Sequence, residues 1–162
     1  FKLVDFSDDL ISKIFLRLQR NCDEYQKIDM RLYRNDVKSD WKILDIKPIS
    51  KISGSECNLY FKKHKKFYYF EAGGDKTFVD IGKGFWIDTF IDGTTSKLYF
   101  KKKDCKFELT FIESNNELRK NFSVKGNRYF YEVISLENKV LTIITQSEEA
   151  KSYYQFNLYP LD

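Results

Sequence analysis

The pentapeptide Leu-Tyr-Phe-Lys-Lys occurs twice in this chain, at residues 59–63 and again at residues 98–102. After each copy a short basic gap leads into a second run rich in aromatic residues, at 67–71 and at 106–112. Two such runs joined by a lysine-rich turn are typical of a β-hairpin. The two copies therefore predict two similar hairpins, which indicate an antiparallel meander that closes into a barrel or half-barrel.

Alternation of apolar and polar side chains continues from Trp41 to the end of the chain. Leu98 and Phe100 share one face of their segment, while Tyr99 and Lys101 share the other, as the two-residue period of a strand requires. Turn signals such as Asp92-Gly93 and Asn138-Lys139 separate the segments. Strands are expected at 41–47, 57–63, 67–71, 77–81, 85–91, 97–102, 106–112, 121–124, 128–135, 139–145 and 152–159, of which some must merge, bend or lie outside a barrel.

Residues 8–26 carry the signals of an α-helix. Ser7 is a good N-cap, acidic residues follow it in the first turn, and Leu10, Ile14 and Leu18 are spaced by four residues. We expect the apolar face of this helix to pack across an open end or a flank of the barrel. The predicted fold is a single domain over 1–162, mostly β, with an arm and helix at 1–38 and an antiparallel up-and-down β-barrel at 39–162.

Composition limits the function classes. The 162 residues carry 28 basic and 24 acidic side chains, a net charge of +4, which is weak evidence for a polyanion partner. No apolar run approaches the roughly 18 residues that a membrane-spanning helix needs. The sequence begins with Phe rather than Met, and a removed leader would explain this, so the cell envelope or secretion is favoured over the cytoplasm.

No motif indicates catalysis, so we predict a protein that is not an enzyme and needs no cofactor. The single histidine, His64, lies in a lysine-rich segment without a neighbouring carboxylate, and one histidine cannot form a multi-histidine metal site. The three cysteines allow at most one disulfide, and none of them forms a Cys-x-x-Cys pair. Of Cys57 and Cys105, the lysines around Cys105 favour it as the reactive thiolate, but an incidental thiol without a function is the preferred interpretation.

The pattern of apolar residues and turns over 39–159 resembles small bacterial lipocalin-like domains, which carry an early Trp, a Gly-x-Trp at mid-chain and a late hairpin. The resemblance implies a calycin-type barrel and, loosely, a hydrophobic ligand. Two features depart from the pattern: Ser39-Asp40 precedes the first Trp in place of Gly-x, and neither a basic residue nor a helix follows the last strand. The matching segments are Trp41-Lys42-Ile43, 59–70, 84–88, 97–100, 131–136 and 141–143.

The predicted function is a binding module that holds a small apolar or amphipathic ligand inside the barrel. An aromatic inner face with few polar groups gives affinity through the apolar area that it removes from water. Trp41 and Trp86 could line such a cavity or plug one end of the barrel. The residues predicted to contact the ligand are Trp41, Phe61, Trp86, Phe100, Leu109 and Tyr131.

Two alternatives remain open. One is a protein-interaction module, such as an envelope-associated or toxin-neutralising partner, in which the barrel is solidly packed and the outer surface makes the contact. The other is a binder of polyanions or single-stranded nucleic acid, although acidic residues between the basic clusters make a nucleic-acid partner the weaker expectation. Lysines at hairpin tips also serve simply to prevent edge pairing. The polyanion site would consist of Lys62, Lys63, Lys65, Lys66, Lys101 and Lys102.

Overall fold

The computed structural model describes residues 40–71, 73–147 and 152–161, together with positions 10, 11, 14, 15, 17, 18, 22, 24, 25 and 28. Strands and helices follow one another through the continuous part of this description. They are β1 (Lys42–Leu44), α3 (Gly54–Lys63), β2 (Lys66–Phe70), β3 (Lys76–Gly82), β4 (Phe85–Thr89), β5 (Thr95–Lys103), β6 (Lys106–Ser114), α4 (Glu117–Phe122), β7 (Arg128–Glu137), β8 (Val140–Ser147) and β9 (Tyr153–Pro160).

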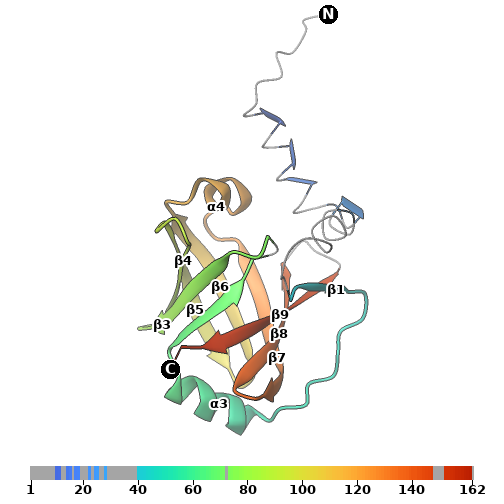
Figure 1. Cartoon of the computed structure of the whole chain (residues 1–162), viewed down its shortest axis with the longest axis vertical. Coiled ribbons are helices and arrows are strands. Elements are labelled where there is room, and N and C mark those ends of the chain that lie inside the picture. Colours follow the sequence, from blue (N-terminus) through green and yellow to red (C-terminus); the bar gives the residue numbers. More distant parts are fainter. Residues whose placement is uncertain are drawn as a thin grey trace, which may run out of the picture.

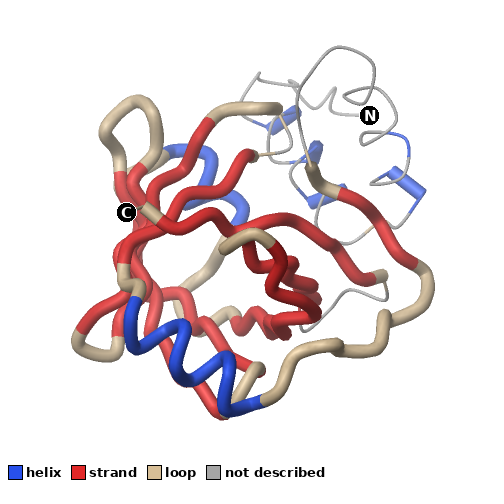
Figure 2. Tube along the Cα trace, turned by 60° about the horizontal axis from the view of Figure 1, so that its bottom comes forward, coloured by secondary structure: helices blue, strands red, loops and turns tan. Residues whose placement is uncertain are grey.

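Eight antiparallel strands form a closed barrel (Figure 1, Figure 2). Each strand from β2 to β9 pairs with the next one in the chain, and β9 also pairs with β2, where Phe67 lies opposite Pro160. The short strand β1 pairs with the first half of β9, with Ile43 opposite Tyr154. The prediction of a mostly β, up-and-down antiparallel barrel is therefore confirmed.

The barrel interior is the hydrophobic core. On β6 the inward residues Phe107 and Leu109 are buried, and Glu108 between them is half-buried on the outside. On β9 the inward residues Phe156 and Leu158 are buried in the same way. The faces predicted from the two-residue period are thus confirmed on both strands.

The strand predicted at 57–63 is wrong, because these residues belong to helix α3. Ser53 is the N-cap of this helix, and its hydroxyl accepts a hydrogen bond from the backbone N–H of Glu56. The Glu56 carboxylate in turn accepts one from the backbone N–H of Ser53 at 2.9 Å, which completes a capping box. This signal lies just before the repeated pentapeptide, so comparison of the two copies does not reveal it.

The two copies of the pentapeptide bury different side chains. In α3, Tyr60 and Phe61 are buried and Leu59 is 69% exposed, whereas in β5, Leu98 is 6% exposed and Tyr99 is 56% exposed. The difference arises because a helix gathers residues three and four apart on one side, while a strand alternates them. The predicted pair of hairpins is therefore one hairpin, β5–β6, and one helix that covers an end of the barrel (Figure 1).

The strand predicted at 121–124 is also wrong, since 121 and 122 are the last residues of helix α4. Asn116 caps this helix, and its side-chain oxygen accepts a hydrogen bond from the backbone N–H of Arg119 at 3.1 Å. Helix α4 connects β6 to β7 and lies at the end of the barrel opposite α3 (Figure 1).

The helix predicted over 8–26 lies largely outside the described residues, as does most of the segment 1–38. The backbone is helical at positions 10, 11, 14, 15, 17 and 18, and the amide of Cys22 donates a hydrogen bond to the carbonyl of Leu18 at 2.9 Å. Among the described elements, α3 is the helix whose apolar face packs against an end of the barrel.

Candidate functional site

The residues predicted to contact a ligand all belong to the packed core or border it. A chain of ring contacts runs through the interior, from Trp41 to Phe156 (4.6 Å between ring centroids), on to Tyr131 (6.2 Å), then to Phe107 (4.9 Å) and to Phe61 (6.0 Å). These rings therefore contact one another along the interior of the described barrel and belong to one hydrophobic cluster. The predicted set is Trp41, Phe61, Trp86, Phe100, Leu109 and Tyr131.

A groove with a volume of about 340 Å³ lies on the outside of the barrel, over β6, β7 and β8. Phe130, Ile144 and Tyr153 give it apolar walls, and Tyr131 is the one member of the predicted ligand set that borders it. Phe130 faces outward because its neighbour in the strand, Tyr131, faces the core. The volume lies within the range of roughly 300 to 1,000 Å³ that small-molecule sites occupy.

The loop at 45–53 forms one border of this groove as it passes along the outside of β7 on its way from β1 to α3 (Figure 1). Lys47 in this loop forms an ion pair with Glu132 at 2.5 Å. The hydroxyl of Ser50 donates a hydrogen bond to the carbonyl of Val133 at 3.2 Å, and the amide of Lys51 donates one to the carbonyl of Ile134 at 2.7 Å. The loop is therefore fixed to the strand next to the groove.

The rim of the groove is basic. Lys101, Lys103 and Lys106 border it, and within the described part of the chain none of these three ammonium groups forms an ion pair. The two carboxylates at the groove have other partners: Glu132 pairs with Lys47, and Glu108 lies 4.0 Å from Arg128. The groove thus combines apolar walls with unneutralised positive charge.

The lysines predicted to bind polyanions converge on the end of the barrel that α3 covers. Burial lowers the pKa of Lys102, the charge of Asp104 raises it, and the charge of nearby Lys65 lowers it further. The Lys102 ammonium also donates a hydrogen bond to the carbonyl of Asp104 at 3.0 Å and one to Asn58 of α3. We call this surface the lysine end; it consists of Lys62, Lys63, Lys65, Lys66, Lys83, Lys101, Lys102, Lys103 and Lys139.

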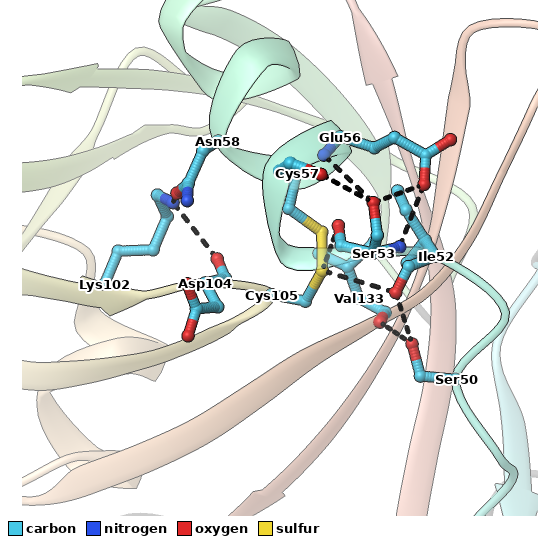
Figure 3. The surroundings of a disulfide bond; sticks show 11 residues. Ser50, Ile52, Ser53, Glu56, Cys57, Asn58, Lys102, Asp104, Cys105 and Val133 are labelled. Atoms are coloured by element: carbon cyan, nitrogen blue, oxygen red, sulfur yellow. Dashed lines mark hydrogen bonds between the residues drawn. A yellow bond between two sulfur atoms is a disulfide. The ribbon is translucent and has the colours of Figure 1, made fainter.

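A disulfide between Cys57 and Cys105 joins α3 to the β5–β6 turn, with 5.4 Å between the two Cα atoms (Figure 3). Cys105 is therefore neither the incidental thiol nor the thiolate considered from the sequence, and in the described residues Cys22 holds the free thiol. The lysines around Cys105 in the sequence stand at exposed or half-buried positions beside the turn, while both sulfur atoms lie under the helix. The disulfide holds α3 over its end of the barrel.

A half-buried ion pair and a buried carboxylate lie at the opposite end, below α4. The Arg119 guanidinium of α4 forms an ion pair with Glu71 at 2.5 Å and lies over the ring of Phe90. Asp88, 9% exposed, points inward from β4 and accepts a hydrogen bond from the Trp86 indole N–H at 2.8 Å. Sequence reasoning missed these groups, although the two-residue period places Asp88 on the same inward face as Trp86.

Burial raises the pKa of Asp88 to about 7. The hydrogen bond from Trp86 and the charge of Arg119 oppose this shift, and the charge of Glu71 adds to it. Burial also raises the pKa of the phenols of Tyr69 and Tyr131, with a further rise from the Asp88 charge. Asp88 is therefore an acid that exchanges its proton near neutral pH inside a mostly apolar interior.

This shift predicts the pH dependence of stability. Between the ordinary pKa of 3.8 and the folded value of about 7, the folded chain binds a proton that the unfolded chain has lost. The contribution of Asp88 to stability is therefore fully present below its unfolded pKa of 3.8. It is lost as the pH rises through its folded pKa of about 7. We expect Asp88→Asn to be more stable than the parent by about 1 to 2 kcal/mol at about pH 8 and to flatten the dependence on pH.

Urea denaturation at about pH 5 and about pH 8 measures this effect. Between these two pH values, the free energy of unfolding is expected to fall more in the parent than in the variant. Asp75→Asn is the matched control, since it removes the same charge from an exposed turn. The prediction would be contradicted if the free energy of unfolding changed equally with pH in the parent and in Asp88→Asn.

Other kinds of site find little support in the described ranges. No group of three or more His, Cys, Asp or Glu side chains among them could hold a metal ion. No helix within them is long and apolar enough to span a bilayer. His64 caps the C-terminal end of α3, and its ring packs 4.7 Å from that of Tyr60.

The fold defines the class of this protein: a closed, eight-stranded antiparallel barrel with a packed aromatic core and a helix fixed over one end. Comparison of the chain with protein-family models, with curated proteins and with solved structures found no match.

Proposed function

We propose that the protein is a binding module without enzymatic activity, and that it holds a small amphipathic ligand with an anionic group in the groove over β6, β7 and β8. The resemblance to small bacterial lipocalin-like domains is part of this proposal, with the ligand moved from the interior to the outer wall. The observation that carries it is the groove itself, whose apolar walls lie beside three lysines that have no ion-pair partner in the described chain.

The chemistry of the groove favours a ligand of two parts. Phe130, Ile144 and Tyr153 offer apolar contacts to a hydrocarbon chain or ring, which gain free energy by removal from water. Lys101, Lys103 and Lys106 offer ammonium donors to a carboxylate, sulfate or phosphate, and hydrogen bonds to a charged group are stronger than those between neutral groups. The hydrophobic core packs behind β6, β7 and β8 and holds in place the strands that form the groove.

Three amphiphiles with hydrocarbon chains of nearly equal length and different head groups test this proposal: decanoate, decanol and decyltrimethylammonium. We expect decanoate to bind most tightly and the cation least tightly in isothermal titration calorimetry. Replacement of Lys101, Lys103 and Lys106 by Gln is expected to weaken decanoate binding about tenfold and to leave decanol binding nearly unchanged. Phe130→Ser is expected to weaken both.

The matched control replaces Lys76, Lys120 and Lys125 by Gln, which changes the net charge equally but lies away from the groove. Equal binding of the three amphiphiles, or an equal loss in the control, would contradict the proposal. Failure of all three to bind would favour the alternative of a protein-interaction module that uses the same outer surface.

A further inference from the structure

The lysine end gathers charge from four segments that are far apart in the sequence. In an up-and-down barrel, alternate turns lie at the same end, so the turns after β3, β5 and β7 meet the start of β2. Lys83 lies in the first of these turns, Lys101 and Lys103 precede the second at the end of β5, and Lys139 lies in the third. Lys62 and Lys66 come from the end of α3 and the start of β2.

Fewer acidic side chains than lysines lie at this end of the barrel. Asp80 lies opposite Lys66 on the neighbouring strand, Glu108 lies opposite Lys101, and Glu137 ends β7 beside the third turn. Glu56 is turned toward its own N-cap, where the Ser53 hydroxyl and amide donate to its carboxylate and lower its pKa. Asp104 lies beside Lys102 and offsets part of that one charge. The lysine end therefore carries an excess of positive charge, which comes from α3, the start of β2 and three turns.

An apolar side chain stands within this surface. Leu59 lies on the outer side of α3 and is 69% exposed, because Cys57, Tyr60 and Phe61 on the inner side fill the end of the core. Lys62 and Lys63 follow it on the same helix and are exposed. An exposed leucine followed by two lysines in the last turn of a helix is a combination that suits binding at an anionic membrane surface.

We propose that the lysine end docks on an anionic lipid bilayer, with α3 lying flat against the headgroups and Leu59 entering the boundary between headgroups and acyl chains. The lysines are attracted to the negative surface potential of such a bilayer. A soluble polyanion would use the lysines but would gain nothing from Leu59, and this distinguishes the two partners. Four lysines belong to the docking surface and do not border the groove, so the two sites can be tested separately: Lys62, Lys63, Lys83 and Lys139.

The test uses sedimentation of the chain with vesicles of phosphatidylcholine alone and vesicles of phosphatidylcholine and phosphatidylglycerol in equal parts. Binding is expected to the anionic vesicles only, and to fall as salt is added. Replacement of Lys62, Lys63, Lys83 and Lys139 by Gln is expected to weaken partitioning by about 600-fold at most, from about fivefold for each lysine close to an anionic surface. Leu59→Gln is expected to weaken it about tenfold.

Two controls make the result specific. Replacement of Lys76, Lys97, Lys120 and Lys125 by Gln removes the same charge away from the lysine end, and this variant is expected to bind like the parent. Soluble polyphosphate is the second probe, and Leu59→Gln is expected to leave its binding unchanged. Circular dichroism of each variant confirms that the barrel is folded.

Three results would overturn the proposal. They are no binding to the anionic vesicles, an equal loss of vesicle binding in both sets of lysine variants, or vesicle binding that Leu59→Gln does not change. The second result would mean that net charge alone drives the attraction, and the third that the lysine end recognises soluble polyanions. Because the four lysines lie outside the groove, decanoate binding by the same variant shows separately whether the proposed function holds.

Discussion

Replacement of Cys57 and Cys105 by Ala is expected to lower the free energy of unfolding by about 4 kcal/mol. The disulfide closes a loop with a sequence separation of 48 residues, and cross-linking a loop of this length restricts the unfolded chain by about that amount at 25 °C. The native state also loses the covalent link between α3 and the β5–β6 turn (Figure 3). Urea denaturation under oxidising conditions measures the change.

The controls separate the cross-link from the side chains. Each single variant breaks the same disulfide and is expected to lose most of the stability that the double variant loses. Cys22→Ala removes a free thiol and is expected to behave like the parent. Reductant is expected to destabilise the parent to the level of the double variant and to leave the double variant unchanged. A double variant within about 1 kcal/mol of the parent would contradict the expectation.

Phe107→Ala is expected to lower the free energy of unfolding by about 3 to 5 kcal/mol. Phe107 is 3% exposed and stands at the centre of the ring contacts, 4.9 Å from Tyr131 and 5.7 Å from Trp86 between centroids. Its removal loses the transfer free energy of the ring and leaves a cavity that closely packed neighbours fill only in part. Thermal and urea denaturation measure the loss.

Phe78→Ala is the matched control, because Phe78 lies on the outside of β3 and is 41% exposed. It is expected to change stability by less than about 1 kcal/mol. Phe107→Leu retains most of the volume and is expected to fall between the two. Equal effects of the two alanine variants would mean that the interior does not carry the packing described above.

The barrel was predictable because its signal is spread over many residues. Each inward position repeats the same two-residue period, so the prediction does not depend on any single residue. Helix α3 was missed because its deciding signal is local: the capping box of Ser53 and Glu56 outweighs the strand propensity of the aromatic residues that follow. The identical pentapeptide at 98–102 lacks such a cap and forms a strand.

The candidate sites were predictable only in part, because they depend on which segments the fold brings together. The basic clusters were visible in the sequence, but their meeting at one end follows from the alternation of turns around a closed barrel. The groove depends on the position of the loop at 45–53, which the ion pair between Lys47 and Glu132 holds against β7. No local sequence pattern predicts this contact. Asp88 could have been recognised from the sequence, because the two-residue period places its carboxylate inside the barrel, where burial of an unpaired charge is costly.

The position of β9 in the sheet has a consequence for biosynthesis. This last strand pairs with β8 on one side and with both β1 and β2 on the other, so the cylinder cannot close until residues 153–160 have left the ribosome. Until then, the aromatic face of a nascent meander stays open to water and to other chains, and contacts of such long sequence separation form slowly. Expression of this chain is therefore expected to depend on chaperones that shield the unfinished sheet.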